Sequence, residues 1–261
     1  VDRRQRQMCI RDRDTTYQYR LGAKRNLIQI LGYIDSIDPL ESVVTMYRKH
    51  FGAEANVIVD IGTTDGDDAE YLFRKLYATT AIAIDANPDA VSLTKNKYPW
   101  MTVIYSAVTE KEGPVEFNKV IGNEIEFTGT SSIFNKDKSI DPPADFYKGK
   151  VQTITVPANR MDTILASENI TGPIDVVKID TEGYSWQVLQ GFGERLKDVK
   201  LFHIETEKVQ VHDDHVLSDQ IVEFMRSNGF VLVDTSYEWG WSIEDQIWVN
   251  PALATRNTEC F

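Results

Sequence analysis

The chain has 261 residues, of which 42% are hydrophobic, so it can build one large α/β domain or two small ones. A formal net charge of -12 disfavours a nucleic-acid backbone or an anionic membrane as the main partner. Cys9 and Cys260 are too few for a disulfide framework or a metal cluster, and no apolar run approaches the roughly 20 residues that span a bilayer. A reducing, cytoplasmic location is therefore the simplest expectation.

The start of the chain differs in composition from the rest. Residues 1–14 are rich in arginine without a sustained period, and we interpret them as a non-native leader, with a disordered basic arm as the alternative. Residues 15–52 are expected to form an N-terminal helical cap on the main domain. Asp38 can cap the clearer of its two helices, with Pro39 at the first helical position and Gly52 at the end.

The main domain is expected over residues 53–261, where apolar strands alternate with helices. Continuous apolar runs with β-branched residues predict buried strands at 56–62, 80–86, 101–108, 174–180 and 199–207. Helical periodicity is found at 67–78, 88–98, 185–196 and 216–230. Strands separated by single helices imply right-handed crossovers and a parallel sheet. The last two strands, 230–236 and 245–250, are expected to be antiparallel.

The alternation stops between about residues 110 and 156. Short β segments are predicted at 113–120 and 123–129, and a polar loop with two prolines follows them. A strand and a short helix return over 151–165. Long excursions of this kind usually line a site or move, so acceptor specificity is expected to lie here.

The stretch VIVDIGTTDGDDAEYL, residues 57–72, predicts a nucleoside site. In open α/β sheets, ligands bind beyond the carboxyl ends of the strands. Gly62 and Gly66 allow tight turning and close approach of the backbone to a ligand. Asp85 ends the second strand and can accept hydrogen bonds from both ribose hydroxyls. The alternative is a tight strand–helix turn capped by Asp65 or Asp67.

The charge of this loop favours S-adenosylmethionine over NAD. A pyrophosphate would lie against Asp65, Asp67 and Asp68, and each close pair of charges would cost about a few kcal/mol at an effective dielectric near 20. S-adenosylmethionine has no phosphate and carries a sulfonium cation. An NAD-type Rossmann oxidoreductase and a non-catalytic cofactor-binding module are the alternatives.

Motifs from about residue 57 to residue 207 resemble the FkbM-like methyltransferases. In chain order they are VIVDIGTTDGD, AIAIDANPDAV, YSAVTEKEG, GTSSIF, RMDTIL, IDVVKIDTEGYSWQVLQGF and FHIETE. This family consists of class I S-adenosylmethionine-dependent enzymes, mostly regarded as O-methyltransferases. The resemblance implies a Rossmann-like α/β fold, with a seven-stranded, mostly parallel sheet, helices on both faces and an antiparallel last strand.

The resemblance also implies a cofactor site. The expected cofactor-binding residues, from the methionine part through the ribose to the adenine, are Asp60, Gly62, Thr64, Asp65, Gly66, Asp85, Ala86, Ser106 and Ala107. Two positions depart from the family pattern. Thr64 replaces a middle glycine, and Ser185 stands where the family often has an acidic residue. Ser185 is the only support for the non-catalytic alternative.

Carboxylates at two strand ends are the candidates for catalysis. Methyl transfer to oxygen requires alignment, and a hydroxyl also needs a base or a metal to lose its proton. We predict Asp180 or Glu182 as base or substrate orienter, Glu205 as a partner, and Lys178 as a charge that fixes a carboxylate or the substrate. A buried Lys–Asp pair with a helix-capping Glu is the alternative. No metal is predicted, although a divalent ion on Asp180 and Glu205 is a second alternative.

Further polar and aromatic residues are candidates for the acceptor side. Ser131 and Ser132 could hydrogen-bond a polar acceptor, and Trp239 and Trp241 could stack on a sugar or ring, unless they form a hydrophobic lid or hairpin. Two further strand residues are expected to have structural roles. His203 is expected to be packed inside the domain, and Glu207 is expected to be a charge at the surface. The sequence thus predicts O-methylation of a hydroxyl on a small molecule or saccharide, and leaves the oligomeric state open.

Overall fold

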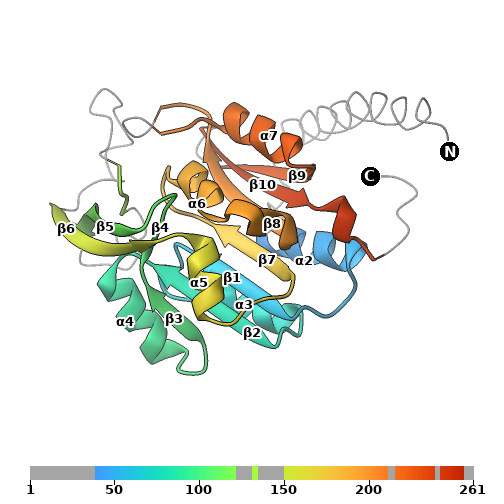
Figure 1. Cartoon of the computed structure of the whole chain (residues 1–261), viewed down its shortest axis with the longest axis horizontal. Helices are drawn as coiled ribbons and strands as arrows, with labels where there is room; N and C mark the ends of the chain where they lie inside the picture. The colour runs from blue at the N-terminus through green and yellow to red at the C-terminus, as the bar shows by residue number, and fades with distance from the viewer. Residues whose placement is uncertain (1–38, 122–130, 135–149, 211–214, 239–241, 256–261) are drawn as a thin grey trace, which may run out of the picture. The chain divides into compact units, whose positions relative to one another are not determined.

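A seven-stranded sheet forms the centre of the fold (Figure 1). The structure is a computed structural model that describes residues 39–121, 131–134, 150–210, 215–238 and 242–255. The expected leader, residues 1–14, and the part of the expected cap before residue 39 lie outside the described residues. All described residues belong to the unit Pro39–Asn257.

The strand order of the sheet is β3-β2-β1-β7-β8-β10-β9. Its members are β1 (Val57–Ile61), β2 (Thr80–Asp85), β3 (Thr102–Tyr105), β7 (Ile174–Ile179), β8 (Val199–Glu207), β9 (Val231–Glu238) and β10 (Ile243–Val249). Neighbours are parallel from β3 to β8, and β10 is antiparallel to both β8 and β9. This is the predicted Rossmann-like sheet with its reversed last strand. The order turns at β1, whose two neighbours are β2 and β7.

Helices cover both faces of the sheet, as predicted. Because side chains alternate along a strand, Val59 and Ile61 of β1 join one core while Ile58 joins the other. The first core is covered by α5 (Met161–Ser167), α6 (Ser185–Gly191) and α7 (Ser218–Ser227). The second face is covered by α2 (Pro39–His50), α3 (Asp67–Lys75) and α4 (Pro88–Lys97). In the described part of the chain, no helix combines the length and the apolar character that a bilayer crossing requires.

Two predicted elements are divided in the structure. The strand expected at 101–108 breaks at Ser106, so that β4 (Ala107–Val108) leaves the main sheet and joins β5 (Gly113–Ile121) and β6 (Lys150–Asn159) in the order β4-β6-β5. The helix expected at 185–196 ends at Gly191 and is followed by a 3₁₀ turn, η2 (Gly193–Asp198). Gly193 has a φ of 51°, which an α-helix does not accommodate. A second 3₁₀ turn, η4 (Pro251–Leu253), follows β10.

The described part of the predicted insertion is a hairpin beside the main sheet. Strands β5 and β6 pair antiparallel over their whole length, from Gly113↔Ala158 to Ile121↔Lys150. Ser132 forms a bridge with Asn118 of β5 and brings residues 131–134 back to the domain. The β segment expected at 123–129 lies outside the described residues.

Candidate functional site

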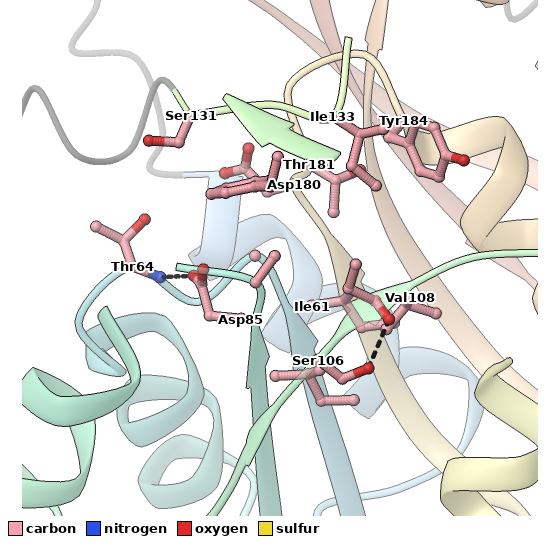
Figure 2. A pocket seen from close by; sticks show the side chains of 15 residues that line it. Ile61, Thr64, Asp85, Ser106, Val108, Ser131, Ile133, Asp180, Thr181 and Tyr184 are labelled. Atoms are coloured by element: carbon pink, nitrogen blue, oxygen red, sulfur yellow. Dashed lines mark hydrogen bonds between the residues drawn. The ribbon is translucent and has the colours of Figure 1, made fainter. Parts of the chain in front are cut away.

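A pocket opens at the carboxyl ends of β1, β2 and β7, where the strand order turns. It encloses about 500 Å³ of empty space, part of it open to solvent. Its lining residues are Ile61, Gly62, Thr64, Ile84, Asp85, Ala86, Ser106, Ala107, Val108, Phe117, Ser131, Ile133, Asp180, Thr181 and Tyr184. Figure 2 shows Ser131 and Ile133 across the pocket from Asp85 and Ser106. Among the described residues that line this pocket, none is a lysine or an arginine.

Asp85 is a buried carboxylate at the end of β2. Its Oδ1 accepts the backbone N–H of Asn87 at 2.7 Å, and its Oδ2 accepts that of Thr64 at 3.0 Å (Figure 2). Burial raises the pKa of Asp85 to about 6, against the opposing effect of these backbone donors. Each carboxylate oxygen keeps a second lone pair, so the side chain can still accept bonds from a ligand in the pocket.

The loop after β1 is shaped by backbone constraints rather than by ligand approach alone. A Cβ at Gly62 would lie 1.7 Å from the carbonyl oxygen of Asp180, so only glycine allows the ends of β1 and β7 to meet. Gly66 has the same requirement toward α4, where a Cβ would lie 2.7 Å from Thr94. Thr64, at the position of the absent middle glycine, has a φ of 53°, which is unusual for a β-branched residue.

The three carboxylates of this loop do not face the pocket, contrary to the expectation that they line the ligand. Lys97 of α4 contacts Asp65 at 2.8 Å and Asp67 at 2.5 Å. Asp68 contacts Lys178 at 3.0 Å. Their charges are therefore largely compensated. The carboxylates that do line the pocket are Asp85 and Asp180, so the charge argument for a cationic ligand holds with different residues.

Lys178 of β7 interacts with carboxylates that come from β1, from α3 and from the end of β7 itself. Its ammonium lies 2.9 Å from Asp180, 3.0 Å from Asp68 and 3.9 Å from the fully buried Asp60. Burial disfavours the charge of Lys178, but these carboxylates outweigh burial and raise its pKa well above the usual range. Asp60 itself accepts the hydroxyl of Thr63 at 2.6 Å and does not line the pocket. The predicted Lys–carboxylate contact is thus present, with three partners.

The three carboxylates that were predicted for catalysis lie close together. Asp180 and Glu182 follow β7, Glu205 lies on β8, and ligand atoms from all three lie within 4.8 Å of one another. Burial raises the pKa of Glu205 well above its usual range, and the charges of Asp180 and Glu182 add to this effect. Such a group is a better proton acceptor than an ordinary glutamate, and three carboxylates at this spacing could also hold a cation.

Glu207 corrects an expectation, because it is buried rather than at the surface. Only 3% of its area is exposed, and the backbone N–H of Gly183 helps to stabilise its charge. Burial raises the pKa of Glu207 to about 7. His203 lies four residues before Glu207 on β8. It is buried, as expected for a packed strand histidine, and its Nε2 lies 3.1 Å from Oδ1 of Asp245.

Residues 131–134 form one wall of the pocket. Ser131 and Ile133 line it, while the Oγ of Ser131 accepts the N–H of Val120 at 3.0 Å. The hydroxyl of Ser132 donates to the carbonyl oxygen of Glu182 at 2.7 Å. Ser132 itself does not line the pocket. The predicted acceptor residues Trp239 and Trp241 lie outside the described residues.

Several lining residues were not predicted from the sequence. Tyr184 packs on Phe134 with ring centroids 5.0 Å apart, and Phe117 reaches the pocket from β5. Tyr184 directly follows the DTEG motif, which was a usable signal, whereas nothing in the sequence places Phe117 or Ile133 here. Ser185, the departure from the family pattern, is buried and donates its hydroxyl to the backbone oxygen of Glu205 at 2.8 Å.

The chain is similar to several solved structures at low sequence identity. Magnesium protoporphyrin IX methyltransferase from Synechocystis PCC 6803, with bound SAM, is 10% identical, and the match covers 81% of this chain and 77% of that one at a TM-score of 0.45. A SAM-dependent methyltransferase from Aquifex aeolicus is 13% identical over 81% and 89% of the two chains, at a TM-score of 0.40. TrmK from M. capricolum, in complex with S-adenosyl-homocysteine, is 13% identical over 82% and 70%, also at 0.40.

Comparison of the sequence with family models is more specific than the comparison with solved structures. No curated protein sequence matches the chain. The family model described as the methyltransferase FkbM domain matches residues 60–232, which include the first strand end, the pocket and the carboxylates on β7 and β8. This match decides against an NAD-type oxidoreductase. The chain therefore belongs to the FkbM methyltransferase family and is an S-adenosylmethionine-dependent methyltransferase.

Proposed function

We propose that this enzyme methylates a hydroxyl group of a small molecule or saccharide. The observation that carries the proposal is the group formed by Asp180, Glu182 and Glu205, whose ligand atoms lie within 4.8 Å of one another beside the cofactor pocket. Asp180 belongs to both features, because it lines the pocket and contributes to the group. A proton acceptor would thus lie next to the site from which a methyl group is delivered.

The residues that line the pocket suit the chemistry of S-adenosylmethionine. Asp85 would hold the ribose hydroxyls, Ser106 and Ala107 would border the adenine, and Gly62 with Thr64 would border the methionine part. Within the described lining, the ionisable side chains other than Tyr184 are acidic, namely Asp85 and Asp180, which suits a sulfonium cation and not a pyrophosphate. When bound, S-adenosylmethionine supplies an activated methyl group.

The protein's own residues would align the acceptor and remove its proton. Glu205 is the favoured base, since burial and neighbouring carboxylates raise its pKa and a base works best when its pKa approaches the working pH. Asp180 and Glu182 would orient the acceptor hydroxyl by accepting hydrogen bonds. Lys178 would keep Asp180 in place at 2.9 Å.

The same charges restrict the acceptor. A carboxylate or phosphate close to Asp180, Glu182 and Glu205 would meet repulsion of about a few kcal/mol per close pair. Polyhydroxylated molecules instead offer several donors to several carboxylates. A neutral acceptor rich in hydroxyls, as a saccharide is, therefore fits this side of the pocket.

The test is transfer of isotope-labelled methyl groups from S-adenosylmethionine into a cell extract, followed by mass spectrometry of the product. We expect the label on an oxygen. We expect Asp180→Asn to lower turnover at least about ten-fold while S-adenosylhomocysteine affinity changes little, because alignment and not cofactor binding is lost. Asp219→Asn, an exposed change on α7, is the matched control.

Two outcomes would contradict the proposal. Label found only on nitrogen or carbon would refute O-methylation, and full activity of Asp180→Asn would remove this residue from catalysis.

Addition of EDTA distinguishes two roles of the carboxylates, as proton acceptors or as metal ligands. If they act as base and orienters, turnover is unchanged, whereas a loss that Mg²⁺ restores would assign them to a divalent ion.

A further inference from the structure

One peptide bond in the carboxylate cluster has a buried polar partner at its carbonyl end and interacts with a buried carboxylate at its N–H end. The carbonyl oxygen of Glu182 accepts the hydroxyl of Ser132 at 2.7 Å. The N–H of Gly183, the other half of the same peptide, helps to stabilise the charge of the Glu207 carboxylate, in opposition to burial, which raises the pKa of Glu207. The φ angles on its two sides are 51° for Glu182 and 91° for Gly183. A glutamate in this region is strained, so its conformation depends on the contacts around it.

The two partners come from distant parts of the chain and are almost fully buried. Ser132 is 2% exposed and Glu207 is 3% exposed. The oxygen of Ser132 also accepts the N–H of Phe134 at 3.1 Å, which leaves its hydrogen for Glu182. Groups buried to this degree cannot exchange their partners for water without cost, so both contacts favour one orientation of the peptide.

We propose that Ser132 and Glu207 are positioning residues that fix the Glu182–Gly183 peptide and so direct the Glu182 carboxylate toward Asp180 and Glu205. The inference rests on the proposed function of that carboxylate group. Without either contact, Glu182 can leave the left-handed region, which an L-residue disfavours. The accompanying change in φ moves its side chain away from the group. Ser132 therefore acts through the backbone and not as a contact of the acceptor.

Two pairs of variants separate this role from simple loss of packing. Ser132→Ala removes the donor and Ser132→Thr retains a hydroxyl. Glu207→Met removes the acceptor at similar size, and Glu207→Gln retains an amide oxygen that can accept the N–H of Gly183. Thr109→Val is the matched control, because it removes another buried hydroxyl that donates to a backbone oxygen, that of Lys111, away from this loop.

Two readouts are used together, namely methyl transfer into the extract and hydrogen–deuterium exchange of the Gly183 amide. For Ser132→Ala and Glu207→Met we expect turnover to fall about ten-fold or more, with S-adenosylhomocysteine affinity within about three-fold of the wild type. The Gly183 amide should exchange roughly ten-fold faster in both. Ser132→Thr and Glu207→Gln should recover most of both signals, and Thr109→Val should change neither.

The inference is overturned if Ser132→Ala behaves like Thr109→Val in turnover, or if exchange of the Gly183 amide is unchanged. A wild-type protein that transfers no methyl group to oxygen would instead refute the proposed function. In that case, the exchange of Gly183 alone decides whether Ser132 and Glu207 hold this peptide. Faster exchange supports the positioning role, and unchanged exchange ends it.

Discussion

Acidic side chains around the pocket lie in very different environments, although the sequence places them in similar strand ends and loops. Asp65 and Asp67 form ion pairs with Lys97 at the surface and are not among the residues that line the pocket. Asp85 is buried and receives two backbone hydrogen bonds. Glu207 is buried without a described basic partner, and the backbone N–H of Gly183 helps to stabilise its charge. At the scale of single residues, function therefore follows from the partner and not from the residue type.

Asp85 gives a pH-dependent prediction. Its raised pKa, about 6, means that it is ionised at neutral pH and protonated as the pH falls below that value. The protonated carboxyl accepts ribose hydroxyls less well, so S-adenosylhomocysteine affinity should fall when the pH is lowered from about 8 to about 5. Isothermal titration calorimetry across this range measures the effect.

The control for that prediction is the variant without the carboxyl group. Asp85→Ala should bind S-adenosylhomocysteine more weakly by about 1–3 kcal/mol at neutral pH, because ribose hydroxyls lose their acceptor. Its remaining affinity should not vary with pH in the same range. Wild-type affinity in Asp85→Ala would show that the ribose lies elsewhere.

At the scale of elements, one buried carboxylate joins a helix to three strands. Asp175 on β7 accepts the hydroxyl of Tyr47 from α2 at 2.5 Å, the backbone N–H groups of Asn56 and Val57 at 2.8 and 2.9 Å, and the ammonium of Lys200 from β8 at 2.6 Å. Burial opposes the charge, but these donors outweigh it and hold the pKa of Asp175 below its usual value. The attachment of α2 to the sheet thus depends on ionised Asp175.

Asp175→Asn should therefore destabilise the protein. We expect a loss of about 3 kcal/mol in urea unfolding at neutral pH, because the amide leaves Lys200 unpaired and points a donor at other donors. The folded-state pKa is lowered, so the wild-type advantage is present above the unfolded value near 3.8 and disappears as pH falls through the folded-state pKa. Tyr47→Phe, which removes one hydrogen bond, should cost only about 1 kcal/mol. An equal loss at acidic pH would contradict this account.

Elements were predicted well where one local signal was sufficient. The apolar runs of β1, β2 and β7 are buried along nearly their whole length, and helical periodicity located α3 and α7. The division at Ser106 was missed because the apolar run continues through it, although the chain changes sheets there. Gly62 and Asp85, which line the pocket, were expected there from the spacing of the strand ends. The salt bridges of the loop carboxylates and the burial of Glu207 were missed because they depend on contacts between distant segments.

At the scale of the whole molecule, charge and family membership point to the same ligand. The chain carries a formal net charge of -12, and no basic side chain is found among the described residues that line the pocket. Both features disfavour phosphate-bearing ligands and polynucleotide acceptors. The pocket at the turn in strand order is therefore suited to a nucleoside whose charge is positive.

Thermal unfolding in the presence of ligands tests this preference. S-adenosylhomocysteine at about a hundred times its Kd should stabilise the protein by about 2.7 kcal/mol. For a domain of this size, that corresponds to a rise in Tm of roughly 5–10 °C. NAD at the same concentration should leave the Tm unchanged, and a comparable shift with NAD would refute the preference.

The departure of the chain from the main sheet at Ser106 separates two tasks. Ser106 still donates its N–H to the carbonyl oxygen of Asp85, so the residues that we propose for the nucleoside lie before β5 in the chain. The hairpin of β5 and β6 returns through β6 to α5, and β4 pairs with β6 in the smaller sheet. If Phe117, Ser131 and Ile133, which line the pocket, are retained, the rest of this module can be exchanged or lengthened without altering the donor pocket. Chimaeras that graft this excursion from a relative should thus acquire a new acceptor with their cofactor affinity intact.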